Sequence, residues 1–320
     1  MERLSFSNHV VPIYGYCANS VLTQAVSHTL ADVIFSRENE EVKMWSPEGG
    51  FVRKPPLESW MGRDKDGELV VTRETELGRI RLALGVFRGL RDLHEGDETS
   101  NMEWLPIIHA DLQSKQYLID STTGHIYLND FNRCRFITKV DPPTTNNYTY
   151  NNNDTNSSAQ GSSTLERCPV YIPSAPGIAR SPEEYDMTAL SEKLDIYSAG
   201  NILYEILTGS HIWDDARNKN TKSAIQRGER PQVNETIRNA VGTVDAELAL
   251  LLDRVYDADP KQRPSAKEVA DQLESMLDRE LKRQRTSSAP DDHLLSDVDE
   301  ESHDEEEHHR RELKVRRRLL

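Results

Sequence analysis

The stretch Leu105–Asn132 reads LPIIHADLQSKQYLIDSTTGHIYLNDFN and decides how the rest of the chain is interpreted. Its runs QYLID and HIYL are rich in β-branched and aromatic residues, and the turn-forming STTG separates them, which predicts a β-hairpin. Asp111 precedes the hairpin and Asp130 follows it, so folding brings two carboxylates to the same end of a small sheet. Two such carboxylates indicate metal and phosphate chemistry. An ordinary hairpin with surface acids is the alternative interpretation.

The sequences around the two aspartates, HADL and DFN, resemble the protein kinase motifs H-R-D-L-x-x-x-N and D-F-G. In that family the first aspartate accepts the proton of a substrate hydroxyl, and the second holds magnesium on the nucleotide phosphates. The resemblance therefore assigns catalysis to Asp111, magnesium binding to Asp130 and a structural role to His109. Lys115 lies where tyrosine-kinase-like members carry a basic residue, and the resemblance gives it a catalytic role.

Three residues depart from the family pattern. Ala110 replaces the arginine that pairs with a phosphorylated activation loop in many members. Gln116 stands where an asparagine binds the second magnesium ion, and it is the candidate for that ligand. Asn132 replaces the glycine, which is a milder change because Asn tolerates left-handed backbone better than most residues.

The composition is acidic: 320 residues carry 54 Asp and Glu against 39 Lys and Arg, a formal net charge of −15. This charge argues against a nucleic-acid binder. The three cysteines show no metal-ligand spacing, which favours free thiols in a reducing compartment. No leader opens the sequence, and no apolar run approaches the roughly 20 residues that span a bilayer. We expect an intracellular, cytoplasmic protein without a membrane span.

The runs NHVVPIYGYC and VLTQAV near the start predict two strands around a short turn. They resemble the last two strands and the hinge of a kinase N-lobe, although a generic hairpin has the same pattern. The resemblance places Thr23 near the gatekeeper position and Leu118 at the floor of the nucleotide cleft. The hinge residues that would meet adenine are Gln24, Ala25 and Val26.

Seven residues precede these strands, which is too few for a Gly-rich phosphate loop, a strand lysine and the helix that carries its glutamate partner. We therefore expect a truncated N-lobe, or an N-lobe whose remainder lies outside this sequence. Residues 36–73 mix charges with Gly-Gly and Pro-Pro pairs, and Trp45 and Trp60 are their bulky anchors. This composition indicates a linker insertion.

From Glu74 to Leu93, apolar residues recur every three or four positions, which predicts an amphipathic helix before the catalytic loop. Residues 141–164 are almost free of aliphatic side chains, which predicts disorder. By resemblance they fall in the activation segment, where phosphorylation often acts. A tolerated surface insertion is favoured instead, because Ala110 cannot bind a phosphate as the arginine would.

The run DIYSAGNILYEILTG, residues 195–209, follows the pattern of the central C-lobe helix of kinases and is the most specific resemblance. It assigns Asp195 to capping the backbone of the catalytic loop. Ser181-Pro182-Glu183 matches the A-P-E motif in two of three positions, and DPKQRPS at residues 259–265 resembles the end of the C-lobe. Resembling proteins join these regions by a buried ion pair, which predicts a structural pair of Glu183 and Arg263.

The sequence thus predicts an α+β, protein kinase-like fold, mainly the helical C-lobe with a remnant β N-lobe. Residues 1–35 would form the remnant strands and hinge, and residues 36–73 the linker. Residues 74–278 would form the C-lobe, with its disordered insertion. Residues 279–320 alternate blocks of charge, which is typical of a disordered tail. A nuclear address in the basic C-terminus is an alternative role for that tail.

The resemblance implies two candidate functions. The first is a degenerate or truncated kinase, a pseudokinase that binds ATP and magnesium weakly and serves as a signalling or scaffold module. The second is an active kinase that transfers the ATP γ-phosphate to a Ser, Thr or Tyr hydroxyl of a protein. We favour the first, because phosphoryl transfer depends on positioning and charge neutralisation, and several of the groups that supply them depart from the pattern. Either function implies a protein substrate or partner.

Overall fold

A computed structural model describes residues 4–17, 20–26, 28–35, 43–45, 51–53, 57, 61–63, 67, 69, 71–96, 104–140, 166–167, 170–172, 177–186, 190–213 and 219–287. The chain divides into two compact units, Met1–Arg279 and Glu280–Leu320. The expected disordered insertion and the tail beyond Ser287 lie outside the described residues. None of the described helices combines the length and the apolar character needed to cross a bilayer.

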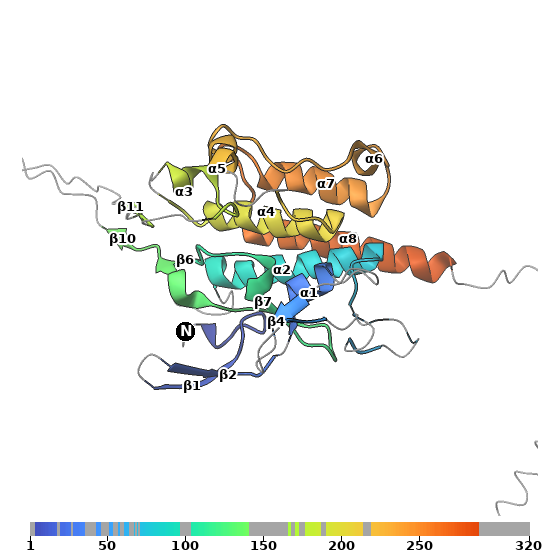
Figure 1. The fold of residues 1–320 in the computed structure, drawn as a ribbon, viewed down its shortest axis with the longest axis horizontal. Helices are drawn as coiled ribbons and strands as arrows, with labels where there is room; N and C mark the ends of the chain where they lie inside the picture. Colours follow the sequence, from blue (N-terminus) through green and yellow to red (C-terminus); the bar gives the residue numbers. More distant parts are fainter. Residues whose placement is uncertain are drawn as a thin grey trace, which may run out of the picture. The chain divides into compact units, whose positions relative to one another are not determined.

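The described strands all precede residue 168, and the described elements after it are helices (Figure 1). The helices are α1 (Leu30–Ile34), α2 (Glu76–Glu95), α3 (Pro182–Tyr185), α4 (Lys193–Thr208), α5 (Lys219–Gln226), α6 (Glu235–Arg238), α7 (Val244–Val255) and α8 (Ala266–Ser287). The strands are β1 (Ile13–Cys17), β2 (Ser20–Thr23), β3 (His28–Thr29), β4 (Lys43–Trp45), β5 (Phe51–Arg53), β6 (Ile107–Ile108), β7 (Tyr117–Ile119), β8 (Ile126–Leu128), β9 (Arg135–Phe136), β10 (Lys139–Val140) and β11 (Glu166–Arg167). This is the expected α+β architecture.

The amphipathic helix predicted before the catalytic loop is α2. The side chain of Thr75 accepts a hydrogen bond from the Gly78 N–H and caps the N-terminus. Gly96 ends the helix with a φ of 74°, a conformation that costs glycine little. Its apolar face, which includes Ile80 and Phe87, is fully buried in the main core.

The predicted hairpin consists of β7 and β8, which pair antiparallel with Tyr117 opposite Leu128. The turn is closed by the Asp120 carboxylate, which accepts hydrogen bonds from the Thr122 and Thr123 N–H groups. On its other edge β7 pairs with β3, so the sheet order is β3-β7-β8. The hairpin therefore joins the N-terminal segment to the helices.

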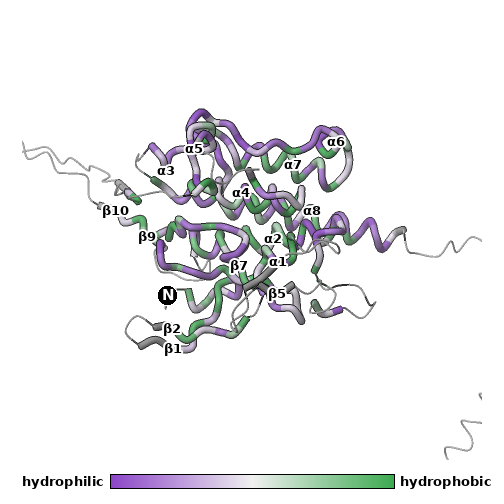
Figure 2. The backbone as a smooth tube through the Cα atoms, viewed as in Figure 1, coloured by the Kyte–Doolittle hydropathy of each residue, from purple (hydrophilic) through white to green (hydrophobic). Residues whose placement is uncertain are grey.

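Helix α4 is the centre of the helical part and is buried from Leu194 to Leu207. Figure 2 shows hydrophobic segments, coloured green, along this helix. It packs against α2 and α7. At Gly200 the two helices α4 and α7 approach closely, since an added Cβ would lie 2.9 Å from Val255 Cγ2 and 3.1 Å from Tyr256 Cε1. Glycine at this position sets the spacing of the helices.

We predict that Gly200→Ala destabilises the fold by about 1–3 kcal/mol through overpacking, although alanine is favoured over glycine in a helix by about 1 kcal/mol. Urea unfolding measures this free energy. The matched control is Gly200→Ala combined with Val255→Ala, which removes the crowding Cγ2. If the effects of the two substitutions on the free energy of unfolding are additive, the proposed contact is contradicted.

Two boundaries differ from the sequence-based expectations. Residues 36–73 are more than a linker, because Leu57, Met61 and Val71 are buried in the main core. These apolar residues belong to no sustained helix or strand period, so the sequence pattern does not reveal their burial. Helix α8 continues past residue 278 to Ser287, and Arg283 pairs with Glu280 on one face of that end (3.0 Å).

Candidate active site

The catalytic loop is anchored by Asp195 in the first turn of α4, and this carboxylate is fully buried. Its Oδ2 accepts a hydrogen bond from the His109 N–H (2.7 Å), and its Oδ1 accepts one from the Ala110 N–H (2.9 Å). His94 Nε2 lies 3.1 Å from the same Oδ2. This is the backbone capping that the sequence assigns to Asp195. One carboxylate thus fixes two consecutive peptide groups of the loop.

His109 connects the loop before the hairpin to the loop after it. The Asp111 N–H donates to His109 Nδ1 (3.3 Å), so the ring proton is on Nε2, which donates to the Asn129 carbonyl (2.9 Å). Burial lowers the pKa of His109, although Asp195 and other nearby carboxylates oppose this shift. His109 is therefore a neutral structural link at pH 7.

The backbone is left-handed at one residue on each side of the hairpin. Ala110 has a φ of 61° and Asp130 a φ of 62°, and no other non-glycine residue in the described part of the chain has positive φ. Such conformations cost on the order of 1–3 kcal/mol and persist where the surroundings impose them. The hydrogen bonds to Asp195 impose the left-handed conformation of Ala110. Asp130, the other left-handed residue, directly follows Asn129.

Arg180 binds the residue that the resemblance assigns as the proton acceptor. Its Nη2 donates to Asp111 Oδ1 (2.6 Å), and its Nη1 donates to the Ala110 carbonyl (2.5 Å). The Arg180 side chain is only 6% exposed, and Asp111 is 16% exposed. Sequence reasoning missed this contact. The only signal was a basic residue directly before the Ser-Pro-Glu motif.

Glu184 lies next to this ion pair, with its Oε1 3.8 Å from Arg180 Nη1. It also accepts hydrogen bonds from the Ser181 N–H (2.8 Å) and the Ser181 hydroxyl (3.1 Å). Burial raises the pKa of Glu184 to about 7, although Ser181 and Arg180 favour the charged form. The group is therefore half protonated near neutral pH.

The candidate magnesium ligands come from both sides of the hairpin. Gln116 ends the 3₁₀ turn Ser114–Gln116 and is buried, and its backbone carbonyl accepts the Asn129 N–H (3.0 Å). That bond holds Gln116 close to the residue preceding Asp130. Both Gln116 and Asp130 carry oxygen donors of the kind magnesium prefers.

Lys115 is exposed and lines a cavity of about 550 Å³ together with Arg180, Glu205 and His211. Burial raises the pKa of Glu205 to about 7, partly offset by a hydrogen bond from Ser114. The sequence analysis did not single out Glu205. It stands in a helix that is buried on all sides, so periodicity gave no sign that its carboxylate faces a cavity.

The hinge residues lie in and after β2. Thr23 pairs with Ile13, and the Gln24 N–H donates to the Pro12 carbonyl (3.0 Å). Ala25 is exposed, and Val26 is half-buried. In the segment that follows, Thr29 of β3 pairs with Leu118 of β7, the residue that the resemblance assigns to the cleft floor. The structure thus brings the chain beyond the hinge beside Leu118.

The predicted pair of Glu183 and Arg263 is present. Arg263 donates from Nη1 to Glu183 Oε1 (2.6 Å) and from Nη2 to Oε2 (3.0 Å). It also donates to the carbonyls of Asp257 (2.8 Å) and Lys193 (3.0 Å). The guanidinium lies over the Tyr197 ring, 5.0 Å from its centre. Arg263 therefore joins the end of the activation segment, α4 and the turn before α8.

The chain is similar to known protein kinases. Residues 174–273 match the family model of the protein kinase domain. Serine/threonine-protein kinase 12 of Arabidopsis thaliana is 29% identical over 201 residues, which are 62% of this chain and 35% of that protein. The brassinosteroid LRR receptor kinase of Solanum lycopersicum is 32% identical over 224 residues, which are 68% of this chain and 13% of the receptor.

RGS domain-containing serine/threonine-protein kinase A of Dictyostelium discoideum is 25% identical over 62% of this chain and 14% of that protein. The chain thus spans well under half the length of these relatives. The fold and these matches show a protein kinase domain at residues 174–273 and a protein kinase-like fold for the chain. Kinase domains generally use ATP with magnesium and act on proteins.

Proposed function

We propose that this chain is a degenerate protein kinase that binds ATP and magnesium weakly, transfers phosphate at or near background, and acts as a protein-binding module in signalling. The observation that carries this proposal is the contact of Arg180 with Asp111 (2.6 Å). A general base must accept the substrate proton within hydrogen-bond reach, about 2.6–3.2 Å. Here a buried guanidinium already occupies one of the two carboxylate oxygens.

The metal site supports the same proposal. Gln116 offers a neutral amide oxygen where the family has an asparagine, and its longer side chain displaces that oxygen. Magnesium requires near-octahedral geometry, so a displaced ligand binds it poorly. A misplacement of about 1 Å in a catalytic group costs on the order of a hundredfold in rate. Asp130 remains as the first ligand and would hold one ion on the nucleotide.

The alternative is an active kinase that phosphorylates a Ser, Thr or Tyr hydroxyl of a protein. One observation favours it: the scaffold of the site is intact. Asp195 fixes the catalytic loop through two hydrogen bonds, and Asp130 has the left-handed backbone of a constrained functional residue. In this alternative Asp111 exchanges Arg180 for the substrate hydroxyl, and Lys115 supplies positive charge.

We expect the transfer of radiolabelled phosphate from ATP to stay at background, with magnesium and with manganese. The variant Asp111→Asn should show the same background rate. The same chain should bind ATP with magnesium weakly, and Asp130→Asn should abolish that binding in a thermal-shift titration. The matched control is Asp120→Asn, which alters an aspartate of the hairpin turn. Robust transfer that Asp111→Asn or Asp130→Asn abolishes, and Asp120→Asn leaves unchanged, would establish the active kinase instead.

A further inference from the structure

A cavity of about 360 Å³ lies between the N-terminal segment, α2, the β7–β8 turn and the side chain of Leu277. Among the described residues that line it, every side chain able to carry charge is basic: His9, Arg81, Arg88 and His125. We call these four residues and the cavity they line the basic pocket. The chain has a formal charge of −15, so a cavity without an acidic lining side chain runs against its composition. None of the candidate active-site residues lines it.

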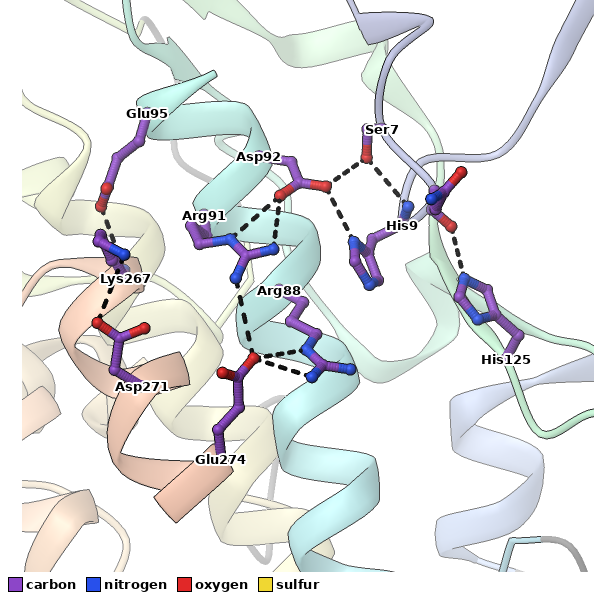
Figure 3. A network of polar contacts seen from close by, with 11 residues as sticks. Ser7, His9, Arg88, Arg91, Asp92, Glu95, His125, Lys267, Asp271 and Glu274 are labelled. Carbon is purple, nitrogen blue, oxygen red and sulfur yellow. Dashed lines mark hydrogen bonds and ion pairs between the residues drawn. The ribbon is translucent and has the colours of Figure 1, made fainter. Parts of the chain in front are cut away.

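The hydrogen bonds of the two histidines fix which ring nitrogens are left to bind a ligand. His9 Nδ1 lies 2.9 Å from Asp92 Oδ2, and His125 Nε2 lies 2.5 Å from the Asn8 carbonyl (Figure 3). Both partners accept hydrogen bonds, so these two nitrogens carry protons. Protonation then adds an N–H at His9 Nε2 and at His125 Nδ1. The two rings stack with their centres 5.5 Å apart.

The surrounding charges hold the pocket in place without neutralising it. Asp92 is bound by His9, by the Ser7 hydroxyl (2.6 Å) and by Arg91 (3.2 Å). Burial opposes ionisation of Asp92, but the bonds from His9 and Ser7 prevail and lower its pKa. On the α8 side, Glu274 accepts from Arg88 (2.9 Å).

The remaining neighbours of the histidines complete the charge balance of the pocket. Tyr127 packs on the His125 ring (4.6 Å), and Asp120 is bound to N–H groups of the turn. Arg81 is exposed, and no acid in the described part of the chain pairs with it. The three arginines at positions 81, 88 and 91 are matched by the three carboxylates at 92, 120 and 274. Protonation of both histidines then gives an excess of two positive charges.

We propose that the basic pocket binds a small molecule that carries a phosphate group. Arginine and protonated histidine form charge-assisted hydrogen bonds with phosphate oxygens, and the cavity volume falls within the roughly 300–1,000 Å³ of small-molecule sites. The net positive charge of the protonated pocket balances a phosphate dianion. Protonation of the two histidines therefore tightens binding.

The test is isothermal titration of the full chain with sulfate and with inorganic pyrophosphate, at pH 6 and pH 8. Sulfate stays a dianion over this range, so its pH dependence reports protonation of the protein. We expect binding about tenfold tighter at pH 6. Arg81→Gln should weaken binding about tenfold, as expected for the loss of one charge-assisted hydrogen bond.

Two controls make the result specific. Arg227→Gln removes an exposed arginine that pairs with Glu229 and does not line the pocket, and it should bind sulfate as the wild type does. Asp130→Asn, altered at the candidate nucleotide site, should also bind sulfate normally. His125→Gln keeps a donor for Asn8 but should reduce the pH dependence, because only His9 can then take up a proton. Binding that is independent of pH, or unaffected by Arg81→Gln, would overturn the proposal.

Discussion

Arg263→Ala should lower the free energy of unfolding by about 3–5 kcal/mol, the range found when one partner of a buried ion pair is removed. The Arg263 side chain is fully buried and Glu183 is 12% exposed, so the substitution leaves a carboxylate with little access to water. The backbone carbonyls of Asp257 and Lys193 lose donors as well. Differential scanning calorimetry should show a melting temperature lower by on the order of 10 °C.

The matched control for this prediction is Arg227→Ala. Arg227 pairs with Glu229 at the same distance, 2.6 Å, but its side chain is 62% exposed. Exposed pairs contribute about 0–1 kcal/mol, so this variant should melt close to the wild type. Equal melting temperatures for the two variants would show that the buried pair contributes no more to stability than the exposed pair does.

Asp195→Ala should destabilise the chain by roughly 2–6 kcal/mol, because each buried donor left without an acceptor costs about 1–3 kcal/mol. The N–H groups of His109 and Ala110 both depend on this carboxylate. Without it, the left-handed conformation of Ala110 loses its support. Urea unfolding measures the stability, and hydrogen exchange of the two amides localises the loss.

Asp195→Asn is the control, because it keeps one side-chain oxygen that can accept one of the two hydrogen bonds. Its free energy of unfolding should lie between that of the wild type and that of Asp195→Ala. The anchoring role would be contradicted if the free energy of unfolding of Asp195→Ala lies within about 1 kcal/mol of the wild-type value and the loop amides stay protected.

Much of the fold could be predicted because the hydrophobic patterns are strong. Helices α2 and α4 and the β7–β8 hairpin are long or sharply bounded by turn residues, so the sequence predicts them directly. Strand β3 could not be predicted, because two residues give no period and it exists only by pairing with β7. The buried side chains of residues 57, 61 and 71 were missed for a similar reason.

In the candidate site, too, some contacts could be predicted from the sequence and others could not. The resemblance to protein kinases predicted Asp195 near the catalytic loop and the contact of Glu183 with Arg263, because both residues lie in motifs that match the family pattern. The Arg180 contact with Asp111 joins residues 69 positions apart in the sequence, and nothing local reports it. The basic pocket was missed because its four side chains come from three separate segments.

The two buried carboxyl groups of Glu184 and Glu205 change how the charge of the protein should be counted. Each has a pKa of about 7, so each carries roughly half a negative charge at neutral pH. The formal charge of −15 therefore overstates the charge of the folded chain by about one unit. The protonation of both groups is most sensitive to their surroundings near pH 7. A cation that approaches either carboxyl group favours its charged form, so that group releases a proton. The folded protein thus acts as a weak buffer beside its own candidate active site.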